Sequence, residues 1–531
     1  MQLTLVDWLV FCSYFFILAL LAWWVNQKRA QNSSDYFLGA NTMPAALVAI
    51  SVLATSQSAA TFLGGPDLGF RGNLSYLASN IGAVLAAFFV MRFLIPRYYA
   101  LKVTTVYELL EQRFSASAKS HSGQMYLFGR VFASGARLFM AALAVSMLLF
   151  NHIDASGVMI SVALLAGIGL LCTMAGGIRS VIYTDALQCV VYVTAALVVL
   201  VYLYSSLSLP WPVLLEALRH PLEQDGSKLL LLDFSVDFSS SGVFNIWSAL
   251  TGFVLLNIAA FGLDQDMTQR VLTCKTPQQG AKALLSSALL VIPVMLVFIL
   301  IGFLLYIFYQ RADLHQGSAL LADSFQGEKV TVFMYYVLNE LPSGLRGLVV
   351  VGVIAAALST ITSGLNSMAS VLVADLYAPW WRKRQSAGVA QQSAGSERHL
   401  VRAGQLAMLL TALALSLMAV LCYYWQQYSD MPLLAFALSV MVFSYSGLLG
   451  VFFTALFTRR GNSRSVTAAL LTGFGVTLVL QPYVLQQISP TLAALDLGFT
   501  WQLCLGSLVA FLVCVSGSPA KVAADALATS R

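Results

Sequence analysis

Long apolar runs dominate the pattern of hydrophobic and polar positions along the chain. Runs of about 20 apolar residues recur from end to end, and each is long enough to cross a hydrocarbon core of about 30 Å as a helix. The strict alternation over about 10 residues that is typical of a β-barrel is not found. The pattern predicts an all-α integral membrane protein with about 13 transmembrane helices. The expected spans are residues 5–26, 45–70, 73–98, 124–150, 156–176, 180–207, 241–263, 284–309, 343–377, 401–425, 432–457, 465–485 and 500–516.

Two of these spans carry small and polar residues that interrupt the apolar run. In the second span the interruption runs from Ser56 to Ala60, and Gly64-Gly65-Pro66 follows. In the seventh span Asn257 is followed by two alanines and Gly262. The two spans lie five apart, which is the offset expected of two five-helix units related by an inverted repeat, each opening with a broken helix. The alternative is that the small residues only allow close helix packing.

Composition and charge agree with a membrane protein and set its expected orientation. Hydrophobic residues make up 59% of the 531 positions and charged residues 10%, against about 25% charged in a soluble domain. Most of the 29 Lys and Arg residues fall on one side if the N-terminus is outside and the C-terminus is cytoplasmic. No basic stripe is interleaved with stacking aromatics, so a nucleic-acid partner is not expected. The lipid bilayer is the expected environment.

One segment of the ninth span gathers polar side chains on a single face. Wound at about 100° per residue, its six polar groups fall within an arc of about 160°, which we call the polar stripe. The polar stripe consists of Ser359, Thr360, Thr362, Ser363, Asn366 and Ser367. Each hydroxyl alone is explained by a bond to the carbonyl one turn back. Together they offer neutral oxygen ligands for a sodium ion, to which an unwound second span would add carbonyls near Ala54 and Gln57.

Asp185 and Arg137 are the two ionisable residues that we expect well inside a span. Ionisable residues at such depth are costly and mark functional sites by default. Asp185 either pairs with Arg179 or completes a second cation site with the polar stripe. The Arg137 guanidinium offers a fork of donors that suits a carboxylate ligand, and structural pairing with Asp185 is the equal alternative.

Five motifs together resemble the sodium–solute symporters, which share the LeuT-type fold with its 5+5 inverted repeat and discontinuous helices. The motifs occur in that family's order and the likeness covers roughly residues 5–515. They read DYFLGANTMPAALVAISVLATSQSAATF, LKVTTVYELLEQRF, MAGGIRSVIYTDALQ, DQDMTQRVL and IAAALSTITSGLNSMASVLVADLY. The resemblance implies a single membrane transport domain over residues 1–531. It divides into an extra N-terminal helix, two five-helix repeats and two C-terminal helices, at 5–26, 45–207, 241–457 and 465–516.

The resemblance also implies roles for individual residues. A principal sodium site would use the backbone carbonyls of Ala54, Gln57 and Ala356 with the hydroxyls of Ser359 and Thr360. A second sodium site would use Asp185, Ser359, Thr362 and Ser363. The substrate cavity would be lined by Ser56, Ser58, Thr61, Asn80, Arg137 and Asn257. Phe261 stands where sugar-carrying relatives have an inner-gate aromatic, and Ala260 stands where they have a gating tyrosine.

These residues predict a symporter that imports a small organic solute by alternating access, with one or two Na⁺ as the coupling ion. Arg137 and its neighbours are similar to the sialic acid branch, which grips a substrate carboxylate. A galactose- or glucose-like sugar is the alternative, and a sensor or channel on the same scaffold is a further one. No HExxH motif or CxxC pair is present, so neither an enzyme nor a metal other than Na⁺ is expected. We expect a functional monomer in a bacterial inner membrane.

Overall fold

The computed structural model describes residues 4–519 except for 28–31, 151, 175, 223–225, 312, 315–330, 386–393, 427–432 and 495. Within this part of the chain the regular secondary structure is helical, without a strand. Eleven of its helices are long and apolar enough to cross a membrane, and up to 13 spans result if each of two bent helix pairs counts as one. The predicted all-α membrane fold is confirmed.

The spanning elements follow one another with short connections. In the first half they are α1 (Leu5–Asn26), α3 (Ala45–Ser56) with α4 (Ala59–Arg71), α5 (Ser75–Phe93), α8 (Ala116–Phe150), α9 (Ala155–Met174) and α10 (Gly177–Leu207). In the second half they are α12 (Ile246–Leu250) with α13 (Gly252–Ile258), α15 (Pro277–Gln310), α17 (Leu345–Val371), α19 (Ala394–Gln426), α20 (Leu433–Phe457), α21 (Ser463–Val479) and α24 (Phe499–Ser516). The shorter helices are α2 (Ser33–Leu38), α6 (Ile95–Leu101), α7 (Glu108–Arg113), α11 (Trp211–Arg219), α14 (Gln265–Leu272), α16 (Val332–Asn339), α18 (Ala378–Gln385), α22 (Pro482–Ile488) and α23 (Pro490–Ala493).

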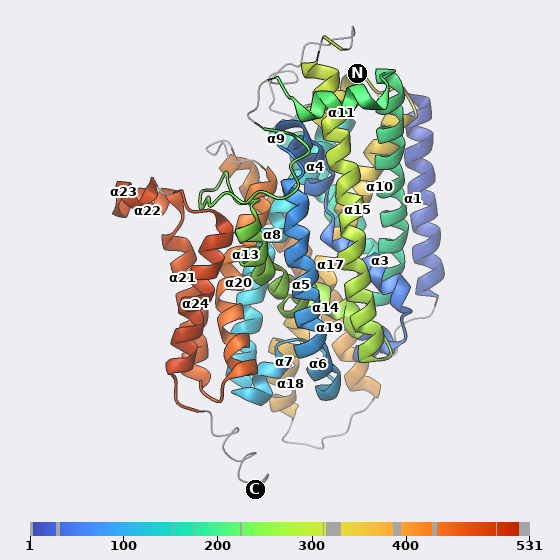
Figure 1. The fold of residues 1–531 in the computed structure, drawn as a ribbon. Helices are drawn as coiled ribbons and strands as arrows, with labels where there is room; N and C mark the ends of the chain where they lie inside the picture. Colours follow the sequence, from blue (N-terminus) through green and yellow to red (C-terminus); the bar gives the residue numbers. More distant parts are fainter. Residues whose placement is uncertain are drawn as a thin grey trace.

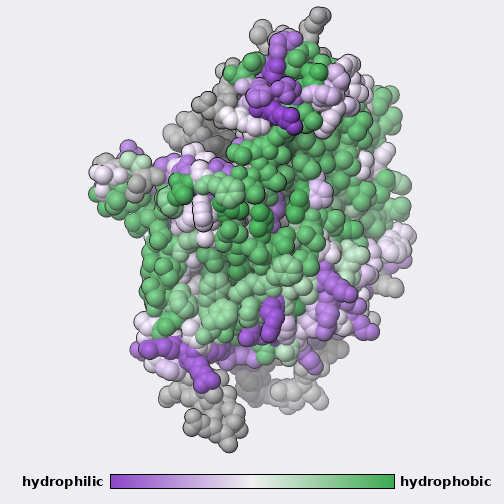
Figure 2. Space-filling model, viewed as in Figure 1, coloured by the Kyte–Doolittle hydropathy of each residue, from purple (hydrophilic) through white to green (hydrophobic). Residues whose placement is uncertain are grey.

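Helix α17, which carries the polar stripe, is the central helix of the bundle (Figure 1). Its most apolar stretch is 94% buried inside the protein, whereas that of α1 at the periphery is 22% buried. Helices α21 and α24 pack on α20 at the opposite edge from α1. Figure 2 shows a broad hydrophobic belt with hydrophilic residues gathered at the two ends, as a membrane-spanning bundle requires.

The predicted break in the second span is confirmed. Helix α3 ends at Ser56, α4 begins at Ala59, and the two are bent by 66°. Gln57 between them is extended, with φ −96° and ψ 124°. Ser58, a residue type that favours the N-cap position, precedes α4. The polar interruption in the sequence therefore marks a real change of backbone direction.

Close packing, the alternative explanation of the glycines, is also present on the α4 part of this span. A Cβ at Gly69 would collide with the carbonyl oxygen of Ile299, and one at Gly302 would collide with that of Pro66. Helices α4 and α15 thus approach at backbone distance, in the manner of small-residue interfaces in membranes. The glycines serve packing, while the Gln57–Ser58 segment makes the break.

Lys228, from the segment between α11 and α12, caps the far end of α4. Its Nζ donates to the carbonyl oxygens of Phe70 at 2.8 Å and Gly72 at 3.2 Å. The same ammonium lies 4.3 Å from the centre of the Tyr306 ring. Burial lowers the pKa of Lys228 to about 8.

The break in the seventh span lies later than predicted. A π-helical turn, η2 (Ala259–Leu263), follows α13, and the backbone becomes extended only at Asp264, with φ −83° and ψ 120°. Asp264 then caps α14, whose eight residues are all buried. The prediction centred the break on Asn257 and the alanines and ended the span at residue 263. The structure corrects the place of the break, because the N-cap aspartate and not the small residues starts the second segment. It confirms the end of the span, since the apolar stretch that can cross a membrane runs over Ile246–Leu263.

The predicted span 465–485 is also corrected. Helix α21 ends at Val479, and α22 turns away from it by 80°. Pro482 occupies the first position of α22, where proline is compatible with a helix start but could not continue the preceding one.

Candidate functional site

The polar stripe of α17 is buried in the middle of the bundle. All six of its residues have at most 2% of their surface exposed. Helix α17 packs against α3, α8, α9, α10 and α14, so the hydroxyls face other helices and not lipid. Buried polar side chains cost free energy unless they are hydrogen-bonded, so the polar stripe requires hydrogen-bond partners from those neighbouring helices.

The residues expected at a principal sodium site come from the end of α3 and from α17. Continuation of α3 would bond the Ser58 N–H to the Ala54 carbonyl, but this N–H points to Thr61 Oγ1 at 3.4 Å. Thr360 donates to the Ala356 carbonyl at 3.2 Å, which is the bond one turn back that the alternative interpretation expects. The break thus frees backbone oxygens beside the polar stripe.

Gln57 adds a further unclaimed oxygen at the same break. Its side chain is buried, and its Oε1 has no hydrogen-bond partner among the described residues. A buried acceptor without a partner costs free energy unless a ligand or a water satisfies it. The break is therefore rich in oxygen acceptors and contains no ionisable side chain.

The residues expected at a second sodium site divide between two carboxylates. Ser359 donates to Asp185 Oδ1 at 2.9 Å, which confirms the predicted proximity of these two side chains. Ser363 instead donates to Asp266 Oδ1 at 2.8 Å. Thr362 donates to the Ser359 carbonyl at 3.1 Å, a local bond within α17.

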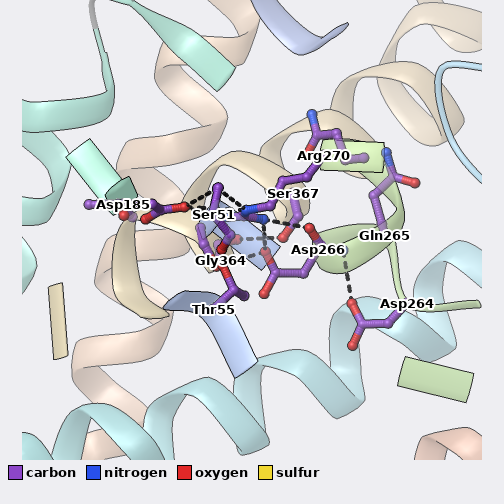
Figure 3. A network of polar contacts seen from close by, with 12 residues as sticks. Ser51, Thr55, Asp185, Asp264, Gln265, Asp266, Arg270, Gly364 and Ser367 are labelled. Atoms are coloured by element: carbon purple, nitrogen blue, oxygen red, sulfur yellow. Dashed lines mark hydrogen bonds and ion pairs between the residues drawn. The ribbon is translucent and has the colours of Figure 1, made fainter. Parts of the chain in front are cut away.

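Asp185 belongs to a buried charge network that the sequence did not predict (Figure 3). Its Oδ2 accepts from Arg270 Nη2 at 3.1 Å and from Ser51 Oγ at 2.5 Å. Arg270 also donates through Nη1 to Asp266 Oδ1 at 2.9 Å. We call the five residues joined in this way the charge network: Arg130, Asp185, Asp264, Asp266 and Arg270.

The far end of the charge network fixes the break at Asp264. Arg130 of α8 donates to Asp264 Oδ2 at 3.0 Å and also bonds to Asp266. Tyr445 of α20 donates to Asp264 Oδ2 at 2.6 Å. Buried charges are tolerated when they are paired and hydrogen-bonded in this way.

One expectation about ionisable residues is therefore wrong, and two of the pairings that the sequence left open do not occur. Asp185 and Arg137 are not the only ones inside the bundle, since the charge network adds four more. Asp185 pairs neither with Arg179, which is 2.8 Å from Asp35, nor with Arg137. The sequence did hold signals for the missed residues: Arg130 lies within the predicted span 124–150, and Asp264 and Asp266 follow Gly262 directly.

The residues expected to line the substrate cavity lie on the two broken elements and on α5 and α8. Ser58, Thr61 and Asn80 are buried, whereas Ser56, Arg137 and Asn257 are half-buried. Phe261, the expected gate residue, is buried within η2. No ion pair is formed by Arg137 within the described part of the chain, and its Nη2 lies 3.0 Å from the sulfur of Met441.

The bundle thus holds a guanidinium on α8 without a carboxylate partner among the described residues, and a helix break whose Gln57 Oε1 has no hydrogen-bond partner there. The sequence profile of the sodium:solute symporter family matches residues 36–473. The chain belongs to this family. It is therefore a multi-pass membrane transporter that couples the movement of a small solute to Na⁺.

Curated relatives with similar sequences are themselves sodium-coupled transporters. The chain is 26% identical over 486 residues to the sodium/sialic acid symporter NanT of Aliivibrio fischeri, covering 92% of this chain and 88% of that protein. It is 24% identical over 470 residues to the sodium/sialic acid symporter SiaT of Proteus mirabilis, covering 84% and 83%. It is also 27% identical over 379 residues to the human sodium/iodide cotransporter, covering 70% of this chain and 56% of that protein.

A solved structure has the same fold. It is the substrate-bound outward-open state of a Na⁺-coupled sialic acid symporter, and it matches with a TM-score of 0.75 at 20% identity over 97% of each chain. The predicted LeuT-type fold is confirmed by this likeness.

Proposed function

We propose that this symporter imports a carboxylated sugar of the sialic acid class by alternating access. The observation that carries the proposal is the half-buried Arg137, which has no carboxylate partner among the described residues. A buried guanidinium is stabilised by a bidentate bond to a carboxylate, and the ligand would supply one. The two sialic acid symporters among the curated relatives support the same substrate class.

The substrate would lie between the two breaks, with Ser56, Ser58 and Thr61 on one side and Asn257 on the other. Hydroxyl and amide groups are suited to the several hydroxyls of a sugar, because each can both donate and accept. Asn80 would contribute from α5, and Phe261 would close the cavity as a gate on the inner side. Arg137 would select the carboxylate.

Sodium would bind at the first break and beside Asp185. The principal site would consist of the carbonyls of Ala54, Gln57 and Ala356 and the hydroxyls of Ser359 and Thr360. The second site would consist of Asp185, Ser359, Thr362 and Ser363. The freed Ala54 carbonyl and the 2.9 Å contact between Ser359 and Asp185 support these assignments.

Two sodium ions would supply enough free energy for accumulation. One charge that crosses 100 mV releases about 2.3 kcal/mol, and a tenfold concentration gradient adds about 1.4 kcal/mol. Two ions therefore yield about 7 kcal/mol, of which a monoanionic substrate would return about 2.3 kcal/mol to the membrane potential.

We also propose that the transporter is a functional monomer in a bacterial inner membrane, with the N-terminus outside. The excess of basic residues on the opposite side supports the orientation. The proposed domain has an extra N-terminal helix at 5–26, repeats at 45–207 and 241–457 and two C-terminal helices at 465–516. The edge positions of α1, α21 and α24 support this division (Figure 1).

Uptake of radiolabelled N-acetylneuraminic acid and of galactose into proteoliposomes tests the proposal. We expect an inward Na⁺ gradient to drive accumulation of the acid, and equilibration alone in choline. Arg137→Ala should lower uptake by about 100-fold, because two charge-assisted hydrogen bonds worth about 3 kcal/mol are lost. Met441→Leu, which keeps the guanidinium and removes only its sulfur contact, is the matched control and should retain uptake. Accumulation of galactose but not of the acid, with Arg137→Ala active, would contradict the assignment.

A further inference from the structure

Asp185, the carboxylate expected to hold the second sodium ion, already binds a cation in this structure. Both the Nε and the Nη2 of Arg270 donate to its Oδ2, at 3.3 and 3.1 Å. Ser51 and Ser359 donate to the two carboxylate oxygens, and all four side chains are fully buried. One of the two carboxylate oxygens, Oδ2, is thus occupied by a guanidinium, while Oδ1 accepts from Ser359, a residue of the proposed second sodium site.

Arg270 reaches Asp185 from a different part of the fold. It lies on α14, beyond the second break, whereas Asp185 lies on α10 and Ser51 on α3. Arg270 also donates through Nε to Ser51 Oγ at 2.9 Å, and through Nη1 back to Asp266, one turn earlier on its own helix. Arg270 therefore has a second carboxylate within reach, to which it stays bound if it leaves Asp185.

The formal charges of the charge network are unequal. Its three carboxylates face two guanidinium groups, so one negative charge in this buried cluster has no partner within it. Arg137, seven residues beyond Arg130 on α8, makes no ion pair within the described ranges. One monovalent cation at Asp185 would make the charge network neutral, with Arg270 then held by Asp266 and Arg130 by Asp264.

We propose that Arg270 is a built-in competitor for the second sodium ion, and that Na⁺ binds by displacing the guanidinium from Asp185 towards Asp266. This inference rests on the proposed function, because it assumes the second sodium site. The tethered guanidinium keeps Asp185 paired whenever sodium is absent, which avoids an unpaired buried carboxylate. It also weakens the second site, so that sodium leaves readily on the low-sodium side. Arg270 thus acts as a positioning residue that sets the sodium affinity of Asp185.

A sodium titration of purified variants, read by intrinsic fluorescence at constant ionic strength in choline, tests the inference. Arg270→Gln removes the competing charge and should lower the half-saturating Na⁺ concentration by about tenfold or more. Arg270→Lys retains a charge that cannot bridge both carboxylates, and it should lower that concentration by a smaller factor. If Arg270→Gln fails to fold, the sodium titration of Arg270→Lys still tests the inference. Arg71→Gln, which removes an exposed guanidinium paired with Asp67, is the control and should leave the titration unchanged.

A double-variant comparison identifies the site at which Arg270 acts. In the Asp185→Asn background, Arg270→Gln should no longer increase sodium affinity. An unchanged or weaker affinity in a folded Arg270→Gln or Arg270→Lys protein would overturn the inference, and so would a gain that persists with Asp185→Asn. Wild-type uptake driven by Na⁺ alongside such a result would leave the proposed function intact. Uptake without any sodium dependence would remove the proposed function itself.

Discussion

The two helix breaks occupy matching places in the fold but are built from opposite chemistry. At the first, Gln57 and Ser58 contribute amide, hydroxyl and carbonyl groups, and the Gln57 Oε1 has no partner among the described residues. At the second, Asp264 is held by Arg130 and Tyr445 while it caps α14. The first break has an oxygen acceptor without a hydrogen-bond partner among the described residues. At the second break, the Asp264 carboxylate is paired with a charged side chain and hydrogen-bonded.

This difference indicates a division of labour. Neutral oxygens attract a monovalent cation without holding it irreversibly, because no fixed negative charge adds to the binding. At the second break Asp264 instead has its own partners, Arg130 on α8 and Tyr445 on α20, which hold the start of α14 against these two helices. We infer that the first break suits an exchangeable ion, as the proposed function requires, and that the second break is a structural anchor for α14.

Among the changes that test this comparison, removal of Arg130 should have the largest effect on the stability of the protein. Arg130→Ala leaves Asp264 and Asp266 without their shared counter-charge, and loss of one partner of a buried pair costs about 3–5 kcal/mol. We expect little folded protein, or a strongly lowered melting temperature, by thermal denaturation in detergent. Arg71→Ala breaks an exposed pair worth about 0–1 kcal/mol and is the control. Wild-type stability of Arg130→Ala would show that the second break is not an anchor.

A smaller effect is expected where packing and not charge holds the first broken span. Gly302→Val places a side chain against the backbone of Pro66 and Phe70, and overpacking of this kind costs about 1–3 kcal/mol. The melting temperature should fall without loss of the fold, and Na⁺-driven uptake should fall as α4 is displaced. Gly475→Ala, at a position with open space around it, is the matched control. Equal behaviour of the two variants would argue against close α4–α15 contact.

The smallest effect is expected from pH. The proposed principal sodium site would consist of carbonyls and hydroxyls, none of which titrates between pH 6 and 7.5. Asp185 of the proposed second site can bind a proton, so the measurement uses the Asp185→Asn variant. Its half-saturating Na⁺ concentration for ²²Na⁺ binding should change by less than about twofold over this range, whereas proton competition would change it by about tenfold per pH unit. The range ends below pH 8, because Lys228 has a pKa lowered to about 8 and would begin to lose its charge. A steep pH dependence would point to a titrating ligand.

The sequence predicted the helices and the first break because both depend on local pattern. Apolar run length determines a transmembrane helix, and Ser58 at an N-cap position determines where α4 begins. The polar stripe was predicted for the same reason, since helical spacing alone places its six residues on one face. All six are buried in the structure.

The charge network could not be predicted in this way because its bonds join residues far apart in the chain. Arg130 meets Asp264, and Asp185 meets Arg270, only after α8, α10 and α14 have packed. Helix α14 has only eight residues and does not form a long apolar run, so a hydropathy pattern does not predict that it is buried. The alternative in which Asp185 pairs with Arg179 is not found, because residues close in sequence need not be close in space.

Direct binding of ²²Na⁺ to the purified transporter tests the central claim that the first break and the polar stripe hold sodium. Thr360→Ala removes one proposed oxygen ligand and should raise the half-saturating Na⁺ concentration by about tenfold, equivalent to about 1.4 kcal/mol. Thr173→Ala removes a buried hydroxyl on α9 that likewise bonds to the carbonyl one turn back, at 2.9 Å, and should bind Na⁺ as the wild type does. Equal Na⁺ binding by Thr360→Ala and the wild type would contradict the account.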